Sequence, residues 1–102
     1  MWVVSMKRLR DFWNRHPEAE MPLRRWYKIA ENGQWASIHE VRKTFPHADL
    51  VTTTSGTVIT VFNVGGNKYR IIARMEYHRH KIYIKEVLSH VQYSRENWKD
   101  RL

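Results

Sequence analysis

Apolar residues recur at helical spacing in the first half of the chain. One stripe follows Ser5, a plausible helix N-cap, and ends at the His16-Pro17 pair; a second runs from Glu18 to Glu31 and a short third from Ile38 to Thr44. The members of the first two stripes are Met6, Leu9, Phe12 and Trp13, then Leu23, Trp26, Tyr27 and Ala30. The pattern predicts two amphipathic helices and a third, shorter helix.

The apolar period changes to alternation in the second half, which predicts strands. Together with a short first strand at Trp2–Val4, the expected strands are Leu50–Thr54, Thr57–Val64, Asn67–Tyr77 and Lys81–Leu88. The last four follow one another through short turns at Ser55-Gly56, Gly65-Gly66 and His78-Arg79-His80, so they must be antiparallel. We therefore expect an α+β fold: a small antiparallel sheet with N-terminal helices packed on one face, in a single domain over residues 1–102.

Alternation within the last two strands separates an apolar side from a cationic side. The cationic side holds Lys68, Arg70, Ile72 and Arg74 in one strand and Lys81, Tyr83, Lys85 and Val87 in the other. The helix-facing side of the last strand would then hold Ile82, Ile84, Glu86 and Leu88. We expect the sheet face opposite the helices to be free and to bring together Lys68, Arg70, Arg74 and Lys85. His90 and Tyr93 would lie at its rim, on one side of a helical turn.

The charge of the chain indicates the class of partner. Eighteen Lys and Arg against 10 Asp and Glu give a formal net charge of +8, which favours a polyanion, nucleic acid first. A membrane surface is the rival, but no apolar run approaches the roughly 20 residues of a spanning helix and the start lacks a signal-peptide pattern. We expect no membrane association and a cytoplasmic location. The absence of cysteine excludes a disulfide framework and a thiolate metal site.

Two segments of the chain contain histidines at spacings that can occur in metal sites. The segment 39–43, His-Glu-Val-Arg-Lys, begins like a zinc-protease helix but has Lys43 where the second histidine belongs. His78 and His80 flank Arg79 in a turn, where they are expected to extend the basic surface instead of binding zinc. No metal site and no cofactor is predicted.

Clustered cations with a histidine and a tyrosine, and without paired carboxylates, suit RNA cleavage that needs no metal. In that reaction the ribose 2′-hydroxyl attacks the adjacent phosphorus, so a protein must remove one proton, supply another and stabilise charge on the phosphoryl oxygens. A cationic strand face is also often no more than a solvated surface. Two alternatives therefore stay open: a noncatalytic RNA- or ribosome-binding module using the same face, and a small interaction domain for an acidic protein.

One segment resembles a known family. The run Val-Phe-Asn-Val-Gly-Gly-Asn-Lys-Tyr-Arg at 61–70, followed by Tyr-Ile-Lys at 83–85 and His-Val-Gln-Tyr at 90–93, resembles the HigB-type toxins of bacterial type II toxin–antitoxin systems, which belong to the RelE-like group. The likeness extends to the helical half, at residues 9–13, 23–27 and 41–46. It covers nearly the whole chain, and the run at 61–70 is its specific part.

The resemblance implies a RelE-like fold and an mRNA interferase, an endoribonuclease that cuts message on the translating ribosome and is silenced by a HigA-like helix-turn-helix antitoxin. Lys68 and Arg70 match the cations of the family's Asn-Lys-Tyr-Arg strand, and Lys85 matches its basic residue on the last strand. His90 and Tyr93 match its terminal Thr-His-x-x-Tyr pattern. The chain departs from that pattern with Ser89 for the common Thr and with Ser94 where an acidic residue often follows the Tyr.

The predicted site assigns a role to each of these side chains. Arg70, Arg74 and Lys85 are expected to bind the scissile phosphate. Lys68, His90 and Tyr93 would share the proton transfers, and the pattern does not decide which of them is acid or base. Further contacts to RNA are expected from Asn67, Arg79 and Lys81.

Overall fold

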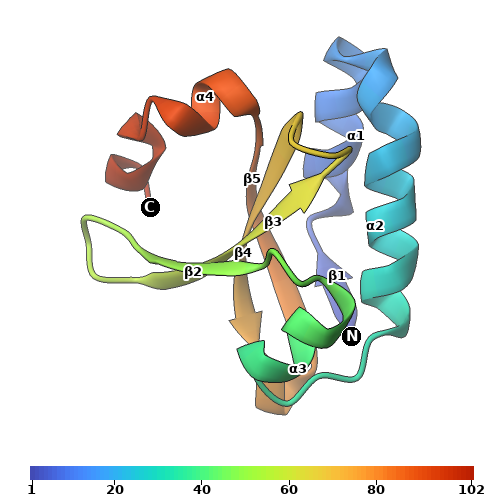
Figure 1. Ribbon diagram of the computed structural model, residues 1–102, viewed down its shortest axis with the longest axis vertical. Coiled ribbons are helices and arrows are strands. Elements are labelled where there is room, and N and C mark those ends of the chain that lie inside the picture. Colours follow the sequence, from blue (N-terminus) through green and yellow to red (C-terminus); the bar gives the residue numbers. More distant parts are fainter.

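A five-stranded sheet forms the centre of the computed structural model, which describes residues 1–102 (Figure 1). Its strands, in the order β1-β5-β4-β3-β2, are β1 (Trp2–Val4), β2 (Asp49–Thr52), β3 (Val58–Val64), β4 (Tyr69–Glu76) and β5 (Lys81–Ser89). The predicted α+β class is confirmed, and β2 to β5 are antiparallel neighbours. The expectation of a wholly antiparallel sheet is wrong, because β1 pairs with β5 in parallel. The helices that separate β1 from the other strands supply the long connection that a parallel pair needs.

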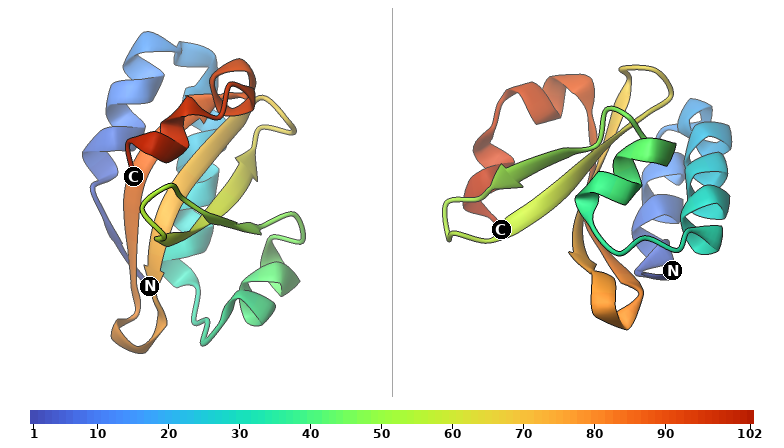
Figure 2. Two further views of the ribbon diagram at one scale, coloured as in Figure 1. Left: turned by 90° about the vertical axis from the view of Figure 1, so that its left-hand side faces the viewer. Right: turned by 60° about the horizontal axis from the view of Figure 1, so that its bottom comes forward.

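Helices occupy both sides of this sheet. They are α1 (Met6–Arg15), α2 (Glu20–Asn32), α3 (Ile38–Thr44) and α4 (His90–Ser94), with short 3₁₀ helices at Pro17–Ala19, Tyr77–Arg79 and Asn97–Asp100. Figure 2 shows α1 and α2 on one side and the C-terminal segment on the other. Ser5 precedes α1 as predicted, but its backbone is left-handed (φ 74°) and its side chain makes no capping bond. None of the helices is long and apolar enough to cross a bilayer.

The main core lies between α1, α2 and the sheet. It contains the predicted stripes of both helices and the inward residues of the central strands, including Phe62, Ile71, Ala73, Ile82 and Ile84. Aromatic rings interlock across the layers: Trp26 packs edge-on against Phe62 with centroids 5.2 Å apart. Burial of these apolar faces is what holds the helices on the sheet.

A second, smaller core covers part of the far face of the sheet. Its buried members are Ile59, Val61, Ile72, Leu88 and Trp98. Trp98 has no exposed surface, and its indole N–H donates to the Tyr93 carbonyl at 3.0 Å. The tail is also tied down at its end, where the Arg101 guanidinium binds both carboxylate oxygens of Glu86 at 3.1 Å. The expectation that this face is free is therefore wrong, because the C-terminal segment folds back over it.

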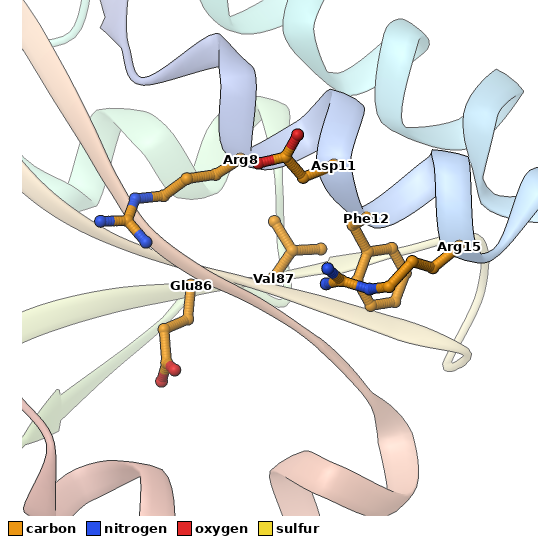
Figure 3. A pocket seen from close by; sticks show the side chains of 6 residues that line it. All are labelled: Arg8, Asp11, Phe12, Arg15, Glu86 and Val87. Atoms are coloured by element: carbon orange, nitrogen blue, oxygen red, sulfur yellow. The ribbon is translucent and has the colours of Figure 1, made fainter.

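A β-bulge at Lys85 changes the face of the sheet to which the later side chains of β5 point. Ile84 pairs with Ala73, whereas Glu86 pairs with Ile72, so Lys85 is the extra residue. Beyond the bulge, Val87 packs toward α1 and Glu86 points to the opposite side, as Figure 3 shows. The predicted facing of Glu86, Val87 and Leu88 is wrong, since one inserted residue moves every following side chain to the other face.

Trp98 is expected to hold the tail against the sheet. Trp98→Ala should lower the free energy of unfolding by about 3–5 kcal/mol, because it empties the centre of the second core. The measurement is urea denaturation. The control is Trp2→Ala, since Trp2 is 67% exposed and its ring lies 5.3 Å from the Lys81 ammonium; we expect that change to cost at most about 1 kcal/mol. Equal losses in the two variants would contradict this role.

Candidate active site

The candidate site is built around the buried guanidinium of Arg70, at the start of β4. Only 7% of the residue is exposed. Its Nη1 donates to the carbonyls of Asn67 and Tyr69, at 3.0 and 3.1 Å, and its Nη2 lies 3.2 Å from His90 Nδ1. Its charged carbon lies 5.2 Å from the centroid of the Tyr93 ring. No carboxylate is among these partners, so the charge of Arg70 is held in place without being neutralised.

The turn before β4 and the helix after β5 place these partners. Gly65 and Gly66 have φ values of 65° and 70°, a left-handed turn that glycine adopts without strain. Across the turn, the His90 N–H donates to the Lys68 carbonyl at 2.8 Å. Ser89 caps α4 through a reciprocal capping box with Gln92. His90 therefore opens a fixed helical turn directly beside Arg70.

The contact with Arg70 determines which nitrogen of His90 is available. A guanidinium has only donors and stays protonated in proteins. His90 Nδ1 must therefore accept the hydrogen bond from Arg70 with its lone pair. In the uncharged ring, the proton then lies on Nε2, which His90 can offer to a ligand.

Tyr93 is also in a proton-donating state. Burial raises the pKa of its phenol, and the carboxylate of Asp49 adds to the rise. Arg70 and Lys99 oppose this change without reversing its direction. The ring is held by Trp98, which stacks on it with centroids 5.3 Å apart. Tyr93 thus keeps its hydroxyl proton at neutral pH.

Arg70 and Tyr93 line an open hollow of about 420 Å³. The other lining residues come from the segment around the end of α3 and from β3: Arg42, Pro46, His47, Ala48, Asp49, Val61 and Asn63. A neighbouring hollow shares His47 and Asn63 and reaches Asn67 in the turn. Sequence reasoning assigned no role to Arg42, His47 or Asn63. The pairing of Asn63 with Arg70 across the β3–β4 hairpin was the one signal available.

Only part of the predicted cation cluster gathers at this site. Lys68 is exposed in the turn next to His90, and Asn67 is exposed beside Asn63. Lys85 occupies the bulge and forms no ion pair; it is three residues from Leu88, the partner of Arg70, or about 10 Å along the strand.

Arg74, Arg79 and Lys81 lie at the far end of the β4–β5 hairpin. Arg74 is four residues beyond Arg70, about 13 Å along the strand, and the second core separates the two. Its Nη1 lies 3.1 Å from Glu76, and its guanidinium stacks over Tyr83. Arg79 is 3.5 Å from the same carboxylate. The expectation that Arg74 meets Arg70 on one surface is therefore wrong.

No group of three or more His, Asp or Glu side chains is placed to hold a metal ion.

Comparison with known proteins identifies relatives of this chain. Residues 19–96 match the family model HigB_toxin, described as a RelE-like toxic component of a toxin-antitoxin system. The mRNA interferase toxin HigB of Escherichia coli K12 is 28% identical over 93 residues, which cover 91% of this chain and 88% of the relative. The mRNA interferase HigB of E. coli CFT073 is 22% identical over 95 residues, covering 93% and 90%. The family match includes Arg70, His90 and Tyr93 and ends before Trp98.

The buried charge of Arg70 is expected to cost stability. A buried cation without a carboxylate pays for its desolvation, so Arg70→Met should raise the free energy of unfolding by about 1–2 kcal/mol. Arg74→Met, which removes a partly exposed partner of Glu76, should leave it unchanged or lower it by up to about 1 kcal/mol. Urea midpoints compare the two variants. A clear loss of stability in Arg70→Met would show that its hydrogen bonds outweigh the desolvation.

Glu76 should make stability depend on pH. Burial works to raise the pKa of this carboxyl, but Arg74, Arg79 and a hydrogen bond with Tyr83 together lower it below its ordinary value. A carboxyl whose pKa is lowered by folding stabilises the fold at pH values above its ordinary pKa. This stabilisation is lost as the pH falls through the lowered pKa and the carboxylate is protonated. Glu76→Gln should therefore melt at a lower temperature than the unmodified protein at pH 7, and the gap should close below about pH 4. A gap that does not change with pH would contradict this account.

Proposed function

This chain belongs to the HigB family of RelE-like toxins, the toxic components of toxin–antitoxin systems, and we propose that it is a metal-independent endoribonuclease that cleaves mRNA. The observation that carries the proposal is the fixed, carboxylate-free guanidinium of Arg70 with proton-carrying His90 and Tyr93 on either side of it. The names of the relatives, which are mRNA interferases, support it.

Arg70 is suited to bind the scissile phosphate. A guanidinium has five N–H donors, of which three are used by Asn67, Tyr69 and His90, so two remain for phosphoryl oxygens. The guanidinium already lies where it is needed and need not reorient as negative charge develops, which is the condition for efficient electrostatic stabilisation.

The reaction exchanges one ester of phosphorus for another. The 2′-oxygen forms a bond to phosphorus, the bond from phosphorus to the 5′-oxygen breaks, and the departing oxygen takes up a proton. Tyr93, through its hydroxyl, is suited to give that proton, and the uncharged ring of His90 can donate a hydrogen bond from Nε2 to the departing oxygen. The products would be a 2′,3′-cyclic phosphate and a 5′-hydroxyl end.

The family and the charge support a proposal for the cellular setting. As the toxic component of a toxin–antitoxin system, the chain has an antitoxin that neutralises it, which we propose to be a HigA-like helix-turn-helix protein. We also propose that cleavage takes place on the ribosome in the cytoplasm, where a net charge of +8 favours approach to RNA. Lys68, Asn67 and Lys85 are proposed to contact RNA around the site, and Arg79 and Lys81 more distantly.

Arg70 and Arg74 provide a matched test, because both are arginines on β4. Arg70→Met should reduce cleavage by at least about 100-fold, the loss expected when a transition-state donor is removed. Arg74→Met should keep activity within about threefold, since its guanidinium is paired with Glu76. The measurements are growth arrest on induction, mapping of message 5′ ends, and cleavage of message by the purified protein with and without ribosomes, the ribosome-free reactions also in EDTA.

Each result separates the candidate functions. Discrete new 5′ ends inside coding regions, lost in Arg70→Met alone, support an endoribonuclease with Arg70 at the phosphate. Intact message together with arrested translation would favour a noncatalytic RNA-binding module instead. Equal losses in both variants would contradict the assignment of the phosphate to Arg70, and ribosome-free cleavage that is lost in EDTA would contradict a metal-independent reaction.

A further inference from the structure

Neither His90 nor Tyr93 is free to remove the proton of the 2′-hydroxyl. His90 Nδ1 accepts the hydrogen bond from Arg70, and its other ring nitrogen carries the proton. Tyr93 keeps its hydroxyl proton because burial disfavours the phenolate. Neither residue therefore supplies the base of the reaction.

The hollow beside Arg70 offers few other groups. Among its lining residues, Arg42, His47 and Asp49 are the remaining ionisable ones. Arg42 stays protonated and cannot accept a proton. Asp49 Oδ1 accepts from the Leu50 N–H at 3.0 Å and lies 3.9 Å from Arg42, and a carboxylate is a weak base near neutrality. His47 forms no side-chain hydrogen bond or ion pair in the protein, so its ring is available.

The backbone on both sides of His47 is anchored. The Ala48 N–H donates to the Phe45 carbonyl at 3.0 Å, and the Arg42 Nε donates to the Ala48 carbonyl at 2.9 Å. Phe45 packs edge-on against Phe62 of the main core, with centroids 5.3 Å apart. Ala48 is buried, whereas His47 between them is exposed. An exposed imidazole thus stands on a fixed loop at the boundary of both hollows.

We infer that His47 is the general base of the cleavage reaction, an inference that rests on the proposed function. His47 takes the proton from the 2′-hydroxyl as the oxygen–phosphorus bond forms, Arg70 holds the phosphoryl oxygens, and Tyr93 gives a proton to the departing 5′-oxygen. The charged or titratable groups that face His47 are Arg42 from α3, Asp49 from β2, Arg70 from β4 and Tyr93 from α4. The base His47 and the acid Tyr93 then line the same hollow.

The test compares His47→Gln with His39→Gln, a matched change at an exposed histidine of α3. The substrate is a short message on programmed ribosomes, followed in single turnover across pH. We expect His47→Gln to slow cleavage by about 100-fold or more, the usual contribution of a general base, and to lose the acidic limb of the pH–rate profile. Binding of a 2′-deoxy substrate, which cannot be cut, should stay within about threefold. His39→Gln should cleave at the unmodified rate.

A second substrate distinguishes the base from the acid. A message with sulfur in place of the 5′-bridging oxygen has a leaving group that needs no proton. It should restore cleavage in a variant of the acid residue Tyr93, such as Tyr93→Phe, and it should not restore cleavage in His47→Gln.

The outcomes separate this inference from the function on which it rests. If His47→Gln retains both its rate and its acidic limb, His47 is not the base, and the endoribonuclease proposal still stands. Rescue of His47→Gln by the sulfur substrate, or loss of the acidic limb in Asp49→Asn instead, would likewise overturn the inference. If the unmodified protein leaves the message uncut, the proposed function fails, and the role of His47 fails with it.

Discussion

The site depends on one constraint, which is that Arg70 is buried inside a small protein without a carboxylate partner. Burying a guanidinium is costly unless its donors are satisfied, and Arg70 satisfies three of its five with two backbone carbonyls and one imidazole. Each partner is neutral, so hydrogen bonding is achieved without cancelling the charge. The turn before β4 and the first residue of α4 must therefore lie where they do, since a shift of either would leave Arg70 unsatisfied and buried.

The C-terminal segment supplies the second half of this arrangement. Tyr93 contacts the Arg70 guanidinium on one side and stacks on Trp98 on the other. Trp98 in turn is buried on the apolar row of β3, β4 and β5 that separates Arg70 from Arg74. The same burial therefore holds the phenol in the site and confines the site to one end of the sheet. The burial of Trp98 therefore contributes both to the stability of the tail and to the geometry of the site.

The sequence predicted the positions of the helices and strands better than it predicted the sheet face to which each side chain points. Ile38–Thr44 was placed correctly because Pro46 bounds it, and the hairpins followed from their turn residues. The alternating pattern did not predict the bulge at Lys85. Its sequence signal is that two apolar residues on the helix side, Ile84 and Val87, lie three residues apart, where regular alternation would give two or four. Of the predicted site, Lys68, Arg70, His90 and Tyr93 are neighbours through local geometry. His47 and Trp98 could not be placed, because tertiary packing of a loop and a tail brings them to the sheet.

The hollow is positive mainly because most acidic residues pair with cations other than Arg70. The net charge of +8 contributes less. Six of the ten acidic residues form ion pairs with lysines or with arginines other than Arg70: Asp11, Glu20, Asp49, Glu76, Glu86 and Glu96. Even Asp49, which lines the hollow, faces Arg42. Glu76 binds both Arg74 and Arg79, so the cations at the far end of the hairpin are largely neutralised. An anion that enters the hollow therefore meets in Arg70 a charge that no carboxylate opposes at contact distance, and more distant charges are screened.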